Sequence, residues 1–89
     1  MKRAHIYFIG NVQGVGFRYT TQRLASNLNL VGWVKNLADG SVEAVVEGDQ
    51  KKIHDLIEEL KKHFSDSIKD CRVNFNEAYG QFKRFEITQ

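Results

Sequence analysis

Apolar and polar positions in the first third of the chain change their spacing at a glycine-rich segment. Residues 4–9 are nearly all apolar or aromatic, which predicts a strand covered over much of its surface. Residues 10–16 contain three glycines and are predicted to form a loop. From residue 17 the apolar positions recur at helical spacing, and we expect this helix to end near Asn29. Its apolar face comprises Phe17, Thr21, Leu24, Ala25 and Leu28.

The middle of the chain has the pattern of a β-hairpin. Residues 31–37 are predicted to form one strand, and residues 41–47 alternate between apolar and polar side chains as a second strand does. Asp39 and Gly40 lie between them and form a dipeptide that is typical of hairpin turns. On the second strand we expect Glu43 and Glu47 to share a solvated face.

The last part of the chain predicts a second helix and one or two further strands. Asp49 is a good N-cap for a helix whose apolar face holds Ile53, Leu56, Ile57, Leu60 and Phe64. Residues 71–76 alternate again and predict a fourth strand, and residues 85–87 suggest a short final one.

The order of these elements is β-α-β-β-α-β with an additional strand at the end. This is the split β-α-β arrangement, an α+β class. We therefore predict a ferredoxin-like sandwich, with an antiparallel sheet of four to five strands and two helices on one face. Residues 1–89 are expected to form a single domain. The fold serves many functions, so it does not by itself choose one.

Composition narrows the class of protein. The chain has 89 residues, of which 42% are hydrophobic and 27% are charged, as expected for a folded globular domain. No apolar run approaches the roughly 18 residues of a membrane span, and the N-terminus lacks the apolar segment of a signal peptide. A single cysteine excludes an internal disulfide and fits a cytoplasmic location. A net charge of +2 is too small for a dedicated nucleic-acid surface, so we expect no nucleic-acid partner.

The glycine-rich loop is the most informative segment for chemistry. Its glycines allow the backbone to turn tightly and expose amide N–H groups beside the positive end of a helix. Arg18 follows in the first helical turn, where a cation is unfavourable unless an anion lies beside it. The pattern favours a phosphate site, although a tight turn next to an exposed arginine would have the same sequence. The spacing matches neither the Walker A loop nor the dinucleotide-binding fingerprint.

Two stretches resemble the acylphosphatase family. Residues 10–18 read Gly-Asn-Val-Gln-Gly-Val-Gly-Phe-Arg, which is similar to the family signature Gly-x-Val-Gln-Gly-Val-x-Phe-Arg. Residues 32–36 read Gly-Trp-Val-Lys-Asn and, with Gly40, Val42 and Gly48, resemble the second signature. The ending Phe-Glu-Ile at residues 85–87 resembles the family's closing Phe-x-Ile. The chain then ends in Thr88 and Gln89, whereas many relatives end in a basic residue and an aromatic one, which puts in doubt support of the arginine by the C-terminal carboxylate.

The resemblance implies an enzyme that hydrolyses acyl phosphates to a carboxylate and inorganic phosphate, with no metal and no cofactor. It makes Arg18 and Asn36 the catalytic residues: Arg18 binds the phosphoryl group together with the loop amides, and Asn36 orients the attacking water. The residues implied in phosphate binding are Asn11, Val12, Gln13, Gly14, Val15, Gly16, Phe17 and Arg18. The expected partner is a small acyl phosphate, and the expected state is a monomer that contacts no membrane.

Two other classes of protein remain as alternatives. Residues 15–19 superficially resemble an aromatic RNA-reading motif, but that motif needs its aromatic residues on a solvent-facing strand, whereas this segment is predicted to open a helix. The second alternative is an acylphosphatase-like domain of a larger system, such as a carbamoyl-transferring maturation protein. Cys71 and the three histidines are expected to be structural or surface residues, because no metal-ligand spacing joins them.

Overall fold

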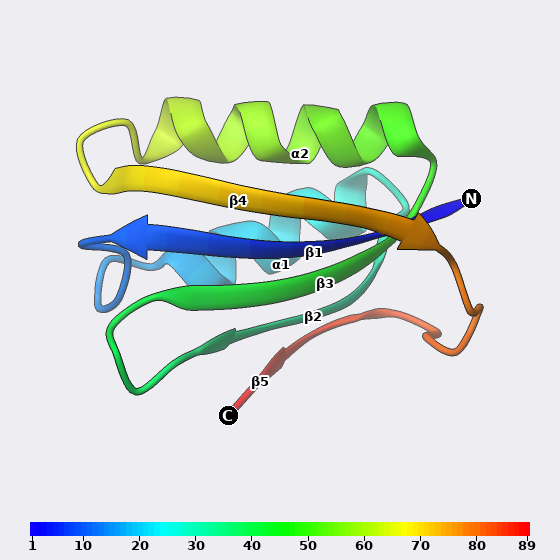
Figure 1. The fold of residues 1–89 in the computed structure, drawn as a ribbon, viewed down its shortest axis with the longest axis horizontal. Helices are drawn as coiled ribbons and strands as arrows, with labels where there is room; N and C mark the ends of the chain where they lie inside the picture. The colour runs from blue at the N-terminus through cyan, green and yellow to red at the C-terminus, as the bar shows by residue number, and fades with distance from the viewer.

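Seven elements form in the order that the sequence predicts, and the final strand is present. The computed structural model describes residues 1–89. The elements are β1 (Lys2–Gly10), α1 (Phe17–Asn27), β2 (Val31–Asn36), β3 (Val42–Gly48), α2 (Gln50–His63), β4 (Ile68–Glu77) and β5 (Phe85–Thr88). The ferredoxin-like α+β fold is therefore confirmed, with both helices on one face of a five-stranded sheet (Figure 1).

The sheet has the strand order β4-β1-β3-β2-β5. The first four strands in this order pair antiparallel, as predicted, whereas β5 pairs parallel to β2. The reason is the path of the connection formed by residues 78–84. It leaves β4 at one edge of the sheet and crosses to the opposite edge at the same end of the molecule (Figure 1). Since β2 also begins at that end, β5 must run in the same direction as β2.

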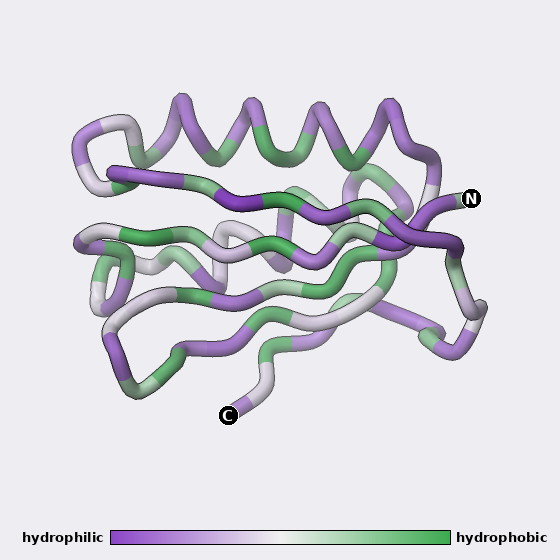
Figure 2. Tube along the Cα trace, viewed as in Figure 1, coloured by the Kyte–Doolittle hydropathy of each residue, from purple (hydrophilic) through white to green (hydrophobic).

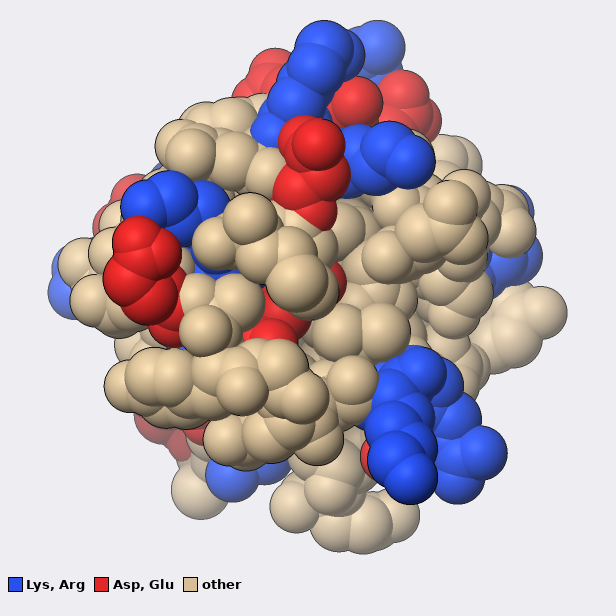
Figure 3. Space-filling model, turned by 90° about the vertical axis from the view of Figure 1, so that its right-hand side faces the viewer, with Lys and Arg blue, Asp and Glu red and all other residues tan.

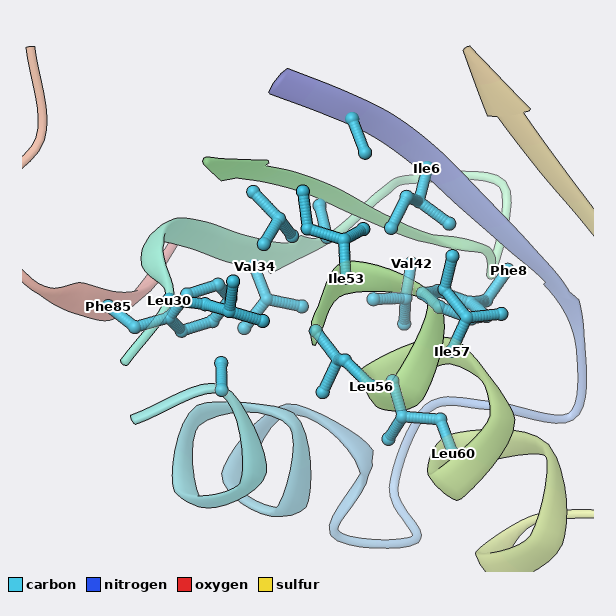
Figure 4. Packing of buried hydrophobic residues seen from close by; sticks show 14 of the residues in the cluster. Ile6, Phe8, Leu30, Val34, Val42, Ile53, Leu56, Ile57, Leu60 and Phe85 are labelled. Atoms are coloured by element: carbon cyan, nitrogen blue, oxygen red, sulfur yellow. The ribbon is translucent and has the colours of Figure 1, made fainter. Parts of the chain in front are cut away.

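The hydrophobic core lies between the sheet and the two helices. Alternate residues of the central strands and one face of α2 meet there (Figure 4). The fully buried members from these elements are Ala4, Ile6, Phe8, Val42, Val46, Ile53, Leu56 and Leu60. Figure 2 shows the same periodicity along α2, with apolar residues toward the sheet and polar residues away from it. The predicted apolar face of the second helix is confirmed.

The helix ends use the residues that the sequence indicated. The side chain of Asp49 accepts a hydrogen bond from the Lys51 amide at 2.8 Å, which caps the start of α2. Asn29 follows the end of α1 with a φ of 59°, the left-handed conformation that asparagine tolerates better than most residues. In contrast, the N-cap residue of α1 is Gly16, which has no side chain to cap the helix, and the first turn of α1 contains no acidic residue.

The prediction that Glu47 lies on a solvated face of β3 is wrong. Its side chain is fully buried and accepts hydrogen bonds from Arg3 Nε at 2.8 Å and from the Tyr79 and Gly80 amides at 3.0 Å each. The connection of residues 78–84 covers this carboxylate, and the Arg3 guanidinium lies 4.4 Å from the centre of the Tyr79 ring. Strand alternation indicates which face a residue occupies but not what folds over that face. We call this cluster, Arg3, Glu47 and residues 78–84, the Glu47 end.

Candidate phosphate-binding loop and active site

The predicted loop joins β1 to α1 at the end of the sheet opposite the Glu47 end (Figure 1). The amide of Asn11 donates to the Ser67 carbonyl at 2.9 Å, which attaches the base of the loop to the connection between α2 and β4. Gly10 has a φ of 137°, and a Cβ atom there would lie 2.1 Å from the Ser67 oxygen. Only glycine therefore allows this close approach of the two backbones.

The loop leaves a row of amide groups without acceptors in the protein. No amide of residues 12–16 donates a hydrogen bond within the chain, and the first helical bond runs from the Thr20 amide to the Gly16 carbonyl at 3.0 Å. Gly14 and Gly16 have φ values of 77° and 81°, which glycine adopts without strain. Unpaired amides next to a helix N-terminus form a binding site for an anion.

The predicted phosphate-binding residues other than Arg18 divide into three groups. Val12 and Phe17 are buried as whole residues, so they anchor the loop in the core. Asn11, Gly14, Val15 and Gly16 are exposed. The side chain of Gln13 is hydrogen-bonded within the protein: its Nε2 donates to the Leu37 carbonyl at 2.8 Å and to the Ser41 carbonyl at 2.9 Å. The sequence pattern contained no sign of this contact.

Arg18 lies in the first turn of α1 and is half-buried. It forms no hydrogen bond with another side chain, and no carboxylate, including the C-terminal one, lies within 4.0 Å of its guanidinium. The donors of the Arg18 guanidinium are thus unused within the protein, and the residue lies in the helical turn that directly follows the unpaired amides. Guanidinium and backbone amides together match the charge and shape of a phosphoryl group.

Asn36 is the last residue of β2, where it pairs with Val42 of β3. Its Oδ1 atom is buried and has no hydrogen-bond partner. A buried acceptor without a partner costs about 1–3 kcal/mol. Such groups are rare in native proteins, and a catalytic role or a bound water molecule is among the reasons for one.

The fold brings these groups to one end of the sheet. The loop, the start of α1 and the turn between β2 and β3 lie together there, and we call this region the loop end (Figure 1). Gln13 joins the loop directly to the turn that follows Asn36. None of the five surface cavities includes Arg18, Asn36 or a residue of the loop. The loop end therefore lies on the surface of the protein and outside these cavities.

Several other ionisable side chains are not among the predicted site residues. His5 Nε2 contacts the Glu43 carboxylate at 2.5 Å, and the His5 ring stacks on the Tyr7 ring. Burial and the nearby Glu43 charge raise the pKa of Tyr7. Burial also raises the pKa of the Cys71 thiol, which disfavours the thiolate that a nucleophile needs. No three His, Cys, Asp or Glu side chains lie close enough together to hold a metal ion. Neither helix has the length and apolar character needed to cross a bilayer.

Comparison with known families agrees with this arrangement. The acylphosphatase family model matches residues 4–87. The chain belongs to the acylphosphatase family. An acylphosphatase of Syntrophobacter fumaroxidans is 44% identical over 88 residues, which cover 98% of this chain and 91% of that protein. The resemblance seen in the sequence is confirmed, and membership of the acylphosphatase family makes this chain an acyl phosphate hydrolase.

Solved structures support the same assignment. The crystal structure of acylphosphatase from Bacillus subtilis superposes with a TM-score of 0.90 at 34% identity and covers all of both chains. The HypF protein of T. kodakarensis superposes with a TM-score of 0.84 at 37% identity, but this chain corresponds to only 12% of its length. The acylphosphatase fold thus occurs both as a chain of this size and as part of a longer one. Residues 17–19 of the supposed RNA-reading segment lie in helix α1, so they cannot present aromatic residues on a strand.

Proposed function

We propose that this chain hydrolyses acyl phosphates by holding the phosphoryl group between the loop amides and Arg18 while Asn36 orients the attacking water. The observation that carries the proposal is the buried Oδ1 of Asn36, an acceptor without a partner in the protein, at the same end of the fold as the unpaired amides. Because Oδ1 is buried where it lies, the side-chain amide of Asn36 would rotate toward the loop to accept from a water molecule, whose lone pair would then be free for attack.

The phosphoryl group is bound by charge and by aligned donors. The amides of residues 13–16 form no hydrogen bond within the protein and would donate to the phosphoryl oxygens, and Arg18 adds a planar pair of donors. Phosphoryl transfer passes through a loose transition state, so catalysis depends mainly on positioning and charge stabilisation. The positive groups of the loop end provide this stabilisation, and we propose that no metal ion is needed.

The water step follows from the chemistry of an amide side chain. Asn36 accepts one water hydrogen through Oδ1, and its NH₂ group can donate to the phosphoryl group. The water oxygen forms a bond to phosphorus while the bond from phosphorus to the acyl oxygen breaks. The carboxylate leaves with that electron pair, and a phosphoryl oxygen takes the water proton. The products are a carboxylate and dihydrogen phosphate. Because a carboxylate is a stable leaving group, the reaction requires no general acid.

We further propose that the protein acts as a cytoplasmic monomer, as one independent domain, on small acyl phosphates and without nucleic acid. Because Asn11, Gly14, Val15 and Gly16 are exposed, a small substrate would reach the phosphate site directly from solvent. Light scattering on the purified chain should give the mass of one copy, 10.3 kDa. A dimer at micromolar concentration would contradict the monomer proposal.

The mechanism is tested by an assay with a synthetic aromatic acyl phosphate in the presence of EDTA. The rate should equal that without chelator, and activity that disappears with EDTA and returns with Mg²⁺ would overturn the metal-free mechanism. In Asn36→Ala, kcat should fall by about 10² or more while the inhibition constant of inorganic phosphate changes little, since the lost contact is made mainly in the transition state. Asn74→Ala, on the exposed face of β4, is the matched control and should behave as wild type.

A further inference from the structure

The side chain of Gln13 connects the two halves of the loop end. Its Nε2 carries two hydrogens, and both are used: one bond goes to the Leu37 carbonyl and the other to the Ser41 carbonyl. We infer that Gln13 is a positioning residue that fixes Asn36 relative to the phosphate-binding amides. This inference rests on the proposed function of Arg18 and Asn36.

The two acceptors of Gln13 belong to the turn that follows Asn36. Leu37 is the next residue after Asn36, and its amide donates to the Ser41 carbonyl at 2.9 Å. The Leu37 carbonyl also accepts from the Gly40 amide at 3.1 Å. Asp39 closes the same turn by accepting from the Ser41 amide and hydroxyl at 2.9 and 2.6 Å. Gln13 is therefore attached to a turn that is itself held rigid by hydrogen bonds.

No other hydrogen bond links residues 11–16 to residues 36–42. The bond from the Asn11 amide to Ser67 attaches the loop to the connection between α2 and β4, away from Asn36. Val12 and Phe17 hold the loop by packing into the core. These other attachments keep the loop folded, and Gln13 adds the hydrogen bonds that join the loop to the turn after Asn36.

The separation matters because the attacking water and the phosphorus atom must meet at about 3–3.5 Å, and a shift of about 1 Å costs on the order of 10² in rate. Two carbonyl acceptors require a side chain with two donors and the reach of glutamine. Asparagine keeps the donors but is one methylene shorter, and leucine is as short as asparagine and has no donor.

The test is a double-mutant cycle in the full chain with Gln13→Leu, Asn36→Ala and the double variant. In the wild-type background Gln13→Leu should lower kcat by about 10-fold to 10²-fold, since it releases the turn from the loop. The inhibition constant of inorganic phosphate should change by less than about threefold, because the amides and Arg18 remain. In the Asn36→Ala background the same change should alter kcat by less than about threefold, because the group that Gln13 positions is gone.

Gln22→Leu is the matched control. The Nε2 of Gln22 also donates to a backbone carbonyl, that of Phe85 at 3.2 Å, but it does not contact the turn after Asn36. Its effect on kcat should be small and equal in both backgrounds. Circular dichroism shows whether each variant folds, and Gln13→Asn replaces Gln13→Leu in the cycle if the leucine variant does not.

Three results would overturn the inference while leaving the proposed function in place. They are an unchanged kcat in Gln13→Leu, an equal loss in both backgrounds, and a weakening of phosphate inhibition as large as the loss of kcat. If Asn36→Ala alone has no effect on turnover, the proposed function fails instead. The single variant Asn36→Ala of the cycle shows this directly.

Discussion

Buried polar groups are largely paired within the protein at one end of the sheet, whereas several polar groups at the other end lack partners. At the Glu47 end a buried carboxylate receives three hydrogen bonds, and its partner Arg3 lies between the Tyr79 and Phe82 rings. One Arg3 nitrogen, Nη2, is the exception, since it is buried without an acceptor. At the loop end the amides of residues 12–16, the Arg18 guanidinium and the Asn36 oxygen lack partners in the protein.

Under the proposed function, the residues that stabilise this small domain lie at one end of the sheet, and the residues that act on the substrate lie at the other end. Groups that are paired internally stabilise the fold, whereas groups left unpaired keep their binding capacity for a substrate and a water molecule. The comparison of Arg3 with Arg18 is the simplest case, because only Arg3 has a carboxylate partner. Figure 3 shows that basic and acidic side chains are interspersed over the Glu47 end, as on an ordinary solvated surface.

Removal of the Glu47 carboxylate should give the largest effect on stability. Glu47→Ala leaves Arg3 and two amides without their acceptor, and we expect the free energy of unfolding to fall by about 3–5 kcal/mol. The kcat of the folded fraction should not change. Urea unfolding and an assay on the same preparation measure both quantities. Glu77→Ala breaks an exposed pair with Lys2 and, as the control, should cost less than about 1 kcal/mol. A stable Glu47→Ala protein would mean that this cluster does not hold the β4–β5 connection.

Arg18 should show the reverse behaviour. Arg18→Gln removes one preorganised cationic donor, and we expect kcat to fall by about 10²–10³. Inhibition by inorganic phosphate should weaken in parallel, while the free energy of unfolding stays within about 0.5 kcal/mol, as for an unpaired surface residue. Arg23→Gln, exposed on the same helix, should leave both unchanged. Wild-type phosphate affinity in Arg18→Gln would contradict the role of this residue as an anion ligand.

Gly16 tests whether the loop conformation is maintained by backbone preference alone. A Cβ atom at Gly16 would meet no atom within 4 Å, so an alanine there suffers only from the φ of 81°. We expect Gly16→Ala to lower the free energy of unfolding by about 1–2 kcal/mol, the cost of a left-handed conformation for an L-residue. Urea unfolding measures this loss. No loss at all would show that the loop adopts a different backbone conformation.

The acid sensitivity of the fold should also arise at the Glu47 end. Burial alone would raise the pKa of Glu47, but hydrogen bonds from the Tyr79 and Gly80 amides and from Arg3 bring it below its usual value of 4.5. A lowered pKa means that the folded state binds the proton more weakly than the unfolded state. This stabilisation is complete above the unfolded pKa and is lost as the pH falls through the folded pKa.

We therefore expect the free energy of unfolding of wild type to decrease more steeply below about pH 4.5 than that of Glu47→Gln, which has no carboxylate to protonate. The effect should be smaller than that of Glu47→Ala, because protonation leaves the side chain in place. Urea unfolding between pH 3 and pH 7 measures the two slopes. Parallel curves for the two proteins would assign the acid sensitivity to other carboxylates.

The sequence by itself determined the local elements of this protein and indicated the region where its chemistry is proposed to reside. Apolar spacing at residues 17–28 and 53–64 identified both helices, and Asp49 and Asn29 marked helix ends, because these signals depend on neighbours within a turn or two. The glycine-rich loop and Arg18 were identifiable for the same reason, and the motifs at residues 10–18 and 32–48 indicated the acylphosphatase family. The roles of Arg18 and Asn36 remain predictions from those motifs.

Only the tertiary structure decided how distant segments cover and contact one another. Alternation placed Glu47 on the outer face of β3, but a connection more than 30 residues away buries it and provides its donors. The parallel direction of β5 follows from the same connection. The bonds from Gln13 to Leu37 and Ser41 span 24 and 28 residues, and the unpaired oxygen of Asn36 is evident only once its surroundings are known. Local periodicity carries no information about such contacts, because they depend on how the whole chain packs.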